Sequence, residues 1–154
     1  MIKEFMKRAI ELSKKNIETG GGPFGAVVVK DGKIIGEGCN KVTSANDPTA
    51  HAEVEAIRQA CKNINHFDLT GAVIYTSCEP CPMCLSAIYW ARLSTIYFAN
   101  TKLDAASIKF DDDFIYTEIP KKHSERKINM VQMMHDEAFE VFKAWNISDK
   151  KINY

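Results

Sequence analysis

The sequence lacks any excess of charge, because its 20 Lys and Arg residues balance its 20 Asp and Glu residues. A protein that binds nucleic acid usually carries a basic excess, so the neutral balance argues against a nucleic-acid partner. The sequence also has no apolar run long enough to span a membrane. Its first sixteen residues scatter charges through the apolar positions, which a signal peptide does not do. We therefore expect a cytoplasmic protein with no membrane association.

The number of cysteines is odd, so they cannot all form disulfide bonds within the chain. There are five of them, and Cys78, Cys81 and Cys84 fall within seven residues. Without a secretion signal, such a tight cluster favours a metal site over disulfides. Cys39 and Cys61 stand apart and are interpreted as small buried hydrophobic residues.

Internal repeats, low-complexity tracts and linkers are also missing, so residues 1–154 are expected to form a single domain. Apolar periodicity predicts helices at 2–18, 48–62, 82–91 and 136–145. Short apolar runs bounded by turn residues predict strands at 25–30, 33–37, 72–75 and 95–99, and a fifth strand is expected at 127–134. Asp47-Pro48 is typical of a helix start and is expected to begin the second helix. This order predicts an α/β fold of three layers, α/β/α, in which helices cover both faces of a five-stranded mixed sheet.

Two short motifs carry the strongest chemical signal. His51-Ala52-Glu53 falls in the first turn of the second predicted helix, and Pro80-Cys81-Pro82-Met83-Cys84 begins the third. If the preceding strands are parallel, both helix starts lie at the same edge of the sheet. Cys81 and Cys84 are three residues apart and face the same way, so with His51 they offer zinc three ligands and leave its fourth position open. Glu53 is the candidate base that takes a proton from water.

Other interpretations of these motifs are weaker. A closed structural zinc site would use Cys78 as a fourth ligand, but it leaves Glu53 without a role. An iron–sulfur cluster would need a further cysteine at position 88, which is Ile. Gly20, Gly22 and Gly25 fit a dinucleotide-binding pattern, but they follow a helix rather than a strand, so a helix stop is the better interpretation.

The pair of His-x-Glu and Pro-Cys-x-x-Cys motifs is the signature of zinc-dependent deaminases. Four segments extend the likeness over nearly the whole chain: GGPFGAVVVKDG, NDPTAHAEVEAIR, YTSCEPCPMCLSAIYWAR and FDDDFIYTEI. Together they resemble the bacterial guanine deaminases of the cytidine-deaminase superfamily. The resemblance implies a cytidine-deaminase-like fold and hydrolysis of guanine to xanthine and ammonia in purine catabolism or salvage.

The resemblance also implies roles for individual residues. One Zn²⁺ per subunit would be held by His51, Cys81 and Cys84, with Glu53 shuttling the proton. The purine base would be bound by Asn40, Asp112, Phe24, Trp90 and Tyr154. Asn40 and Asp112 would form hydrogen bonds with it, Phe24 and Trp90 would line the pocket, and Tyr154 would close it. Such enzymes are homodimers that exchange their C-terminal segments, here about residues 136–154.

Three alternatives to guanine deamination remain at this point. The adenosine deaminases that act on tRNA share the motif pair, although they call for an electropositive face. Deaminases of cytosine, cytidine, guanosine or aminotriazines differ in only a few pocket residues. A non-catalytic module stabilised by zinc is the alternative outside the enzymes. Within the aspartate run, Asp111 or Asp113 could take the place of Asp112.

Overall fold

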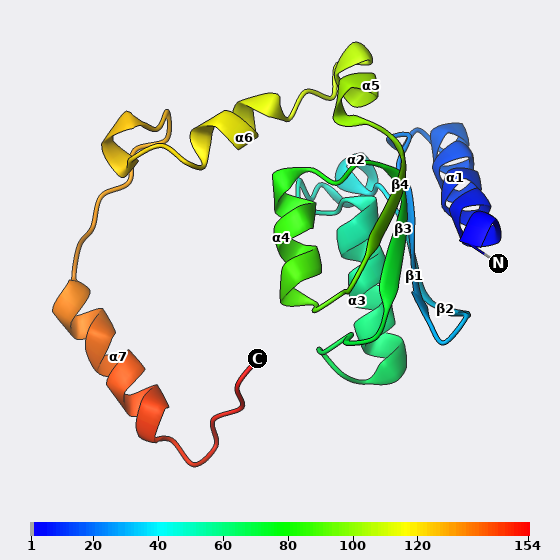
Figure 1. Cartoon of the computed structure of the whole chain (residues 1–154). Coiled ribbons are helices and arrows are strands. Elements are labelled where there is room, and N and C mark those ends of the chain that lie inside the picture. The colour runs from blue at the N-terminus through cyan, green and yellow to red at the C-terminus, as the bar shows by residue number, and fades with distance from the viewer. Residues whose placement is uncertain (1) are drawn as a thin grey trace. The chain divides into compact units, whose positions relative to one another are not determined.

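The computed structural model describes residues 2–154, which divide into two compact units, one that ends at Phe114 and one that begins at Ile115. The first unit holds the sheet and the motifs, and Figure 1 shows its elements in chain order. These elements are α1 (Ile2–Glu18), β1 (Gly25–Lys30), β2 (Lys33–Cys39), α2 (Val42–Ala45), α3 (Ala52–Ile64), β3 (Val73–Cys78), α4 (Pro82–Trp90), β4 (Ile96–Asn100) and α5 (Lys102–Ser107). The helix α6 (Asp113–Glu118) begins at the end of this unit.

The four strands form a mixed sheet in the order β2-β1-β3-β4. Strand β1 is antiparallel to both of its neighbours, and β3 is parallel to β4. It follows that β2 and β3 run in the same direction, with β1 between them. Because α3 follows β2 and α4 follows β3, both helices begin at the same edge of the sheet.

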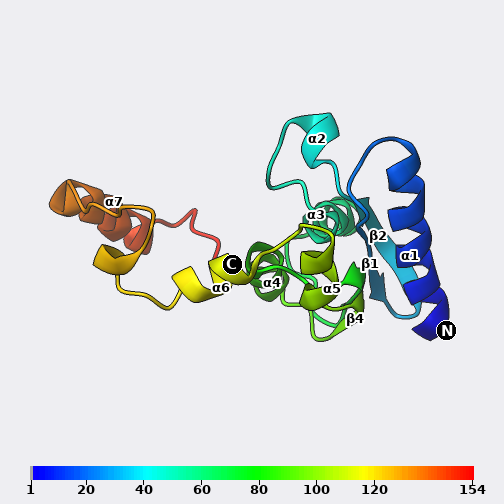
Figure 2. The ribbon, with the colours of Figure 1, turned by 90° about the horizontal axis from the view of Figure 1, so that it is seen from above.

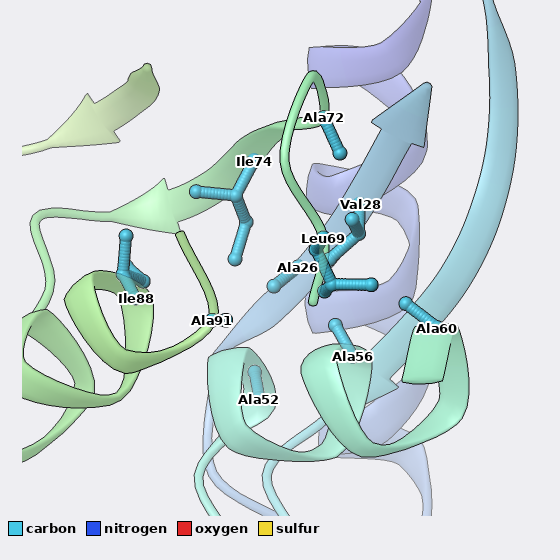
Figure 3. Close-up of a cluster of buried hydrophobic side chains, with 10 residues drawn as sticks. All are labelled: Ala26, Val28, Ala52, Ala56, Ala60, Leu69, Ala72, Ile74, Ile88 and Ala91. Atoms are coloured by element: carbon cyan, nitrogen blue, oxygen red, sulfur yellow. The ribbon is translucent and has the colours of Figure 1, made fainter. Parts of the chain in front are cut away.

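Helices cover both faces of the sheet, as the alternating side chains of β1 require. Val27 and Val29 face α1, whose Ala9 is fully buried against them. Ala26 and Val28 face the other way, toward α3 and α4. Figure 3 shows that core, in which alanines of α3 lie under the sheet beside Leu69, Ile74 and Ile88. Seen from above in Figure 2, α1 and the pair α3 and α4 lie on opposite sides of the strands. The three-layer α/β/α architecture is confirmed.

Helix α3 packs unusually close to β2 because both surfaces carry small residues. A Cβ atom added at Gly38 would lie 2.1 Å from the Ala52 carbonyl oxygen, and one added at Gly36 would lie 2.3 Å from that of Ala56. Only glycine permits such an approach of helix backbone to strand. The contact fixes the first turn of α3, which carries Glu53, against the sheet.

The start of α3 differs from the prediction. The helix begins at Ala52, with His51 as its N-cap residue, rather than at Pro48. Asp47 forms a local turn instead: its Oδ1 accepts hydrogen bonds from the Thr49 backbone N–H (2.8 Å) and hydroxyl (2.7 Å). This competing turn chemistry explains why Pro48 and Thr49 form a turn and the helix begins only after His51.

The second unit contains the rest of α6, a 3₁₀ turn at His123–Glu125 and α7 (His135–Ile147). The final helix predicted at 136–145 is therefore confirmed. The strand predicted at 127–134 is wrong, so the sheet has four strands rather than five. Apolar residues recur in that segment, but within the described chain it has no strand to pair with. In the described part of the chain, no helix combines the length and the apolar character needed to cross a bilayer.

Candidate metal centre

The two motifs meet at the edge of the sheet where α3 and α4 begin. His51 is the N-cap residue of α3 and Cys81 that of α4, and both have extended backbones. Their carbonyl oxygens accept the first helical hydrogen bonds, from the N–H groups of Glu55 and Leu85 respectively. Neither side chain forms a capping hydrogen bond with its own helix, and their donor atoms lie close to each other instead. Cys84 follows in the first turn of α4 and is fully buried.

The donor atoms of these three residues are spaced as a zinc ion requires. The Nδ1 atom of His51 lies 3.5 Å from the Sγ atoms of both Cys81 and Cys84. All three donor atoms lie within 4.8 Å of one another. Tetrahedral zinc with ordinary bond lengths places sulfur and nitrogen ligands about 3.6 Å apart. One imidazole and two thiolates at this spacing therefore fit zinc.

Electrostatic interactions within the cluster already favour a thiolate. The hydrogen bond with Cys84, aided by His51, lowers the pKa of the Cys81 thiol to about 4. The same contact with Cys81, together with burial, raises the pKa of Cys84. Contact with Cys81 also raises the pKa of His51. The start of each helix adds a positive dipole end, which stabilises anionic ligands. A metal ion that binds here displaces the proton of the Cys84 thiol.

Glu53 lies directly beside the metal ligands and is shielded from water. Glu53 is only 8% exposed, and its Oε2 atom lies 3.4 Å from the Sγ atom of Cys84. Burial raises the pKa of the Glu53 carboxyl. A carboxyl group with a raised pKa can both accept and return a proton near neutral pH. Its position and chemistry suit a proton carrier at a metal site.

Cys78 lies outside the cluster formed by the other two cysteines of its motif. It ends β3, and its Sγ atom lies 3.6 Å from the carbonyl oxygen of Thr101. Burial raises the pKa of its thiol to about 11, so it stays protonated. The geometry thus leaves three protein ligands, the number typical of a catalytic zinc site.

Two of the residues expected to bind the base lie close to each other. Asn40 follows β2 and is buried, and its Oδ1 atom accepts a hydrogen bond from the Val42 backbone N–H at 3.2 Å. Phe24 precedes β1, and its carbonyl oxygen accepts a hydrogen bond from the Asn40 backbone N–H at 3.2 Å. The ring of Phe24 packs edge-on against Phe110, with ring centroids 4.9 Å apart. Phe110 was missed by the sequence analysis, although it is the first residue of the FDDD segment.

The three aspartates of that segment have different surroundings. Asp111 accepts a hydrogen bond from the backbone N–H of Asp113 at 3.0 Å, and the Asp113 carboxylate lies 3.5 Å from Lys102 Nζ. Asp112 interacts electrostatically with Lys102 as well, and in addition with His51 and Cys81. Burial, with a contribution from Cys81, raises the pKa of Asp112. Of the three carboxylates, Asp112 is therefore the one that the structure associates with the metal ligands.

The remaining two residues expected to bind the base are Trp90 and Tyr154. Trp90 ends α4, six residues beyond Cys84, and is 67% exposed. It lines a surface hollow with Ser86, Tyr89 and Arg92. Tyr154 belongs to the second unit, so its relation to the cluster stays a prediction.

Comparison with known proteins agrees with this site. Residues 1–100 match the family model of the cytidine and deoxycytidylate deaminase zinc-binding region. The chain is 54% identical to the guanine deaminase of Bacillus subtilis (strain 168) over 149 residues, or 96% of each protein. The X-ray structure of guanine deaminase from Bacillus subtilis matches with a TM-score of 0.95 at 52% identity, covering 99% of this chain and 98% of that one.

Two further relatives are more distant. A structure of guanine deaminase from Nitrosomonas europaea matches with a TM-score of 0.68 at 27% identity, covering 94% of this chain and 84% of that one. A tRNA-specific adenosine deaminase of Aquifex aeolicus is 41% identical, but over only 62% of this chain and 63% of its own length.

Proposed function

Because the chain belongs to the cytidine and deoxycytidylate deaminase zinc-binding family, we propose that it hydrolyses guanine to xanthine and ammonia. One observation carries this choice of substrate: the likeness to guanine deaminases continues through the C-terminal unit, past the shared zinc-binding region. The tRNA-specific relative matches over a much smaller part of the chain. The protein is a zinc-dependent hydrolase of the cytidine-deaminase type, and its substrate is a free purine base.

His51, Cys81 and Cys84 would hold the zinc ion, since their donor atoms have the required identity and spacing. When bound, zinc supplies Lewis-acid activation of a water molecule at its open position. The two thiolates balance the charge of the ion.

Glu53 would move the protons of the reaction. Its buried carboxylate takes a proton from the attacking water and passes it to N3 of guanine as the water oxygen bonds to C2. A second proton from the same water then reaches the amino group through Glu53, and the C2–N bond breaks to release ammonia. The raised pKa of Glu53 suits this exchange, because both its protonated and ionised forms are needed in one turnover.

The purine itself would be held by groups around the Phe24–Asn40 contact. Asn40 and Asp112 would form hydrogen bonds with the base, and Phe24 would cover its ring. A carboxylate such as Asp112 accepts hydrogen bonds from purine N–H groups and selects against a base that lacks them, since an unmatched buried carboxylate is costly. Trp90 and Tyr154 would complete the pocket in the assembled protein.

The assembled protein would be a homodimer that exchanges residues 136–154 between its subunits. Support comes from α7, where large apolar side chains are exposed when the chain is taken alone: Phe139, Val141, Phe142, Trp145 and Ile147. Large exposed apolar patches commonly mark protein interfaces. We also expect the protein to work in the cytoplasm, where the two cysteine ligands stay reduced.

Ammonia release from a panel of substrates tests the proposal. The purified, zinc-loaded protein is given guanine, guanosine, cytosine, cytidine and a tRNA stem-loop that carries adenosine. We expect rapid release from guanine alone, and loss of that activity on treatment with a chelator. Turnover of another substrate without guanine would keep the zinc chemistry and reject the purine pocket. A protein that deaminates nothing and unfolds without zinc would be a binding module.

A further inference from the structure

A buried asparagine on α1 joins the two segments that carry the proposed base-binding residues. Asn16 is 9% exposed, two residues before α1 ends. Its side-chain amide donates one hydrogen bond to the carbonyl oxygen of Gly22 and another to that of Asn40, each at 2.8 Å. Gly22 lies in the loop that leads to Phe24, and Asn40 follows β2. One NH₂ group thus uses both of its protons to connect two loops.

The backbone of Asn16 is tied into the same loop. Its carbonyl oxygen accepts hydrogen bonds from the Gly21 N–H at 2.9 Å and the Thr19 hydroxyl at 3.0 Å. A Cβ atom at Gly21 would lie only 2.3 Å from Nδ2 of Asn16, so the loop closes directly over the amide. The loop and the side chain therefore fix each other's position.

Movement of this loop would reach the Asn40 side chain. A Cβ atom at Gly22 would lie 3.2 Å from Cγ of Asn40, which shows how closely the two residues approach. The hydrogen bond from the Asn40 N–H to the Phe24 carbonyl oxygen completes the connection. Asn16, Gly22, Phe24 and Asn40 form one contiguous unit, which we call the loop clasp.

We propose that Asn16 is a positioning residue for purine binding, which it serves by holding Phe24 and Asn40 in place through the loop clasp. The inference rests on the proposed function, because it takes Phe24 and Asn40 as residues that contact the base. Both hydrogen bonds of the Asn16 amide go to segments that carry no metal ligand. Loss of the Asn16 amide should therefore weaken substrate binding and leave zinc in place.

The physical basis is the cost of unpaired buried carbonyl groups. Without the amide, the carbonyl oxygens of Gly22 and Asn40 lose their shared donor. They would turn toward water or toward other donors, and the glycine-rich loop offers little resistance to that movement. Small displacements of groups that hold a substrate reduce activity strongly.

The test compares Asn16→Leu, which keeps the size of the side chain but has no donor, with Asn16→Ser, which keeps one donor. The matched control is Asn63→Leu, because Asn63 of α3 also donates its amide to a strand carbonyl, that of Ile35, at 2.8 Å. For each protein we measure KM and kcat for guanine, bound zinc, and the Kd of the product xanthine by calorimetry.

We expect Asn16→Leu to raise KM and the Kd of xanthine on the order of tenfold, with a much smaller change in kcat and one zinc per subunit retained. Asn16→Ser should fall between this variant and the wild type, and Asn63→Leu should match the wild type. If Asn16→Leu does not fold, Asn16→Ser alone decides the outcome. Unchanged KM and Kd in a folded variant, or equal changes in Asn63→Leu, would overturn the role of Asn16. A wild-type protein that does not deaminate guanine would instead reject the proposed function.

Discussion

At the scale of single residues, the role of Glu53 as proton carrier can be tested by comparing it with Glu55, which lies in the same first turn of α3. Glu53 is buried beside Cys84, whereas Glu55 forms exposed ion pairs with Lys41 and Arg58. Replacing Glu53 with Gln keeps the shape of the side chain but removes its ability to exchange a proton. We expect Glu53→Gln to lower kcat by about 10²- to 10⁴-fold while zinc content, measured by atomic emission, stays at one per subunit.

The matched control for that prediction is Glu55→Gln, which should keep wild-type kcat and zinc content. A Glu53→Gln protein that turns guanine over at the wild-type rate would show that another group moves the proton. A Glu53→Gln protein that loses its zinc would show that Glu53 is needed for zinc binding rather than for proton transfer.

The sequence could predict those site residues whose function depends on residue type and spacing. His51, Cys81 and Cys84 were predicted as a cluster, and the structure brings them together. Choosing among three adjacent aspartates needed the surroundings of each one, which only the fold supplies. Asn16 could not be predicted at all. On an amphipathic helix a single asparagine suggests the polar face, and its two backbone partners lie 6 and 24 residues away.

At the scale of secondary-structure elements, one ion pair connects α1 to the edge strand β2. The guanidinium of Arg8 donates two hydrogen bonds of 2.7 Å to the carboxylate of Glu37. This contact with Arg8 lowers the pKa of Glu37 below its ordinary value of 4.5. A lowered pKa in the folded state means that the pair stabilises the fold above about pH 4.5. That contribution is lost as the pH falls through the pKa of folded Glu37.

We expect Arg8→Met to lower the free energy of unfolding by about 1 kcal/mol at pH 7, since both side chains are about one-third exposed and water screens the pair. The difference from wild type should shrink toward zero as the pH falls below 4.5 and through the lower pKa of folded Glu37. Urea unfolding at several pH values measures it, and a double-mutant cycle with Glu37→Gln isolates the pair. A difference that does not depend on pH would assign the effect to lost packing of the arginine stem.

The elements themselves were predictable where periodicity and turn residues agreed. The first helix and the final helix follow apolar periodicity, although the buried side of α1 holds Asn16 while Ile10 and Ile17 are exposed. The start of α3 was misplaced because Asp47 has two local uses, a helix cap and a turn, and the fold selects the turn. The false strand at 127–134 shows that recurring apolar residues do not make a strand without a neighbour to pair with.

At the scale of the whole molecule, the C-terminal unit has the fewest buried apolar side chains to stabilise it within a single chain. Phe142 is 70% exposed and Trp145 is 46% exposed in a helix with no buried residue among those described. Leaving such side chains in water forgoes the stabilisation that burial would give. A second copy of the chain that covers α7 would supply it, which is the physical reason for the homodimer that we propose.

Exchange of the C-terminal segment can be separated from simple dimer formation by mixing two inactive chains. One chain carries Glu53→Gln with an intact tail, and the other has a wild-type metal centre but ends before Ile152, so it lacks Tyr154. If the tail acts on the partner's site, the mixed dimer contains one complete site, formed by the truncated subunit and the tail of the Glu53→Gln subunit. We expect co-expressed, doubly tagged dimers to regain about half of wild-type turnover, since one site of two is restored.

The two homodimers, purified in parallel, should stay inactive. Mixed dimers without activity would mean that each tail serves its own subunit, and a truncated homodimer with full activity would mean that Tyr154 plays no part in the site.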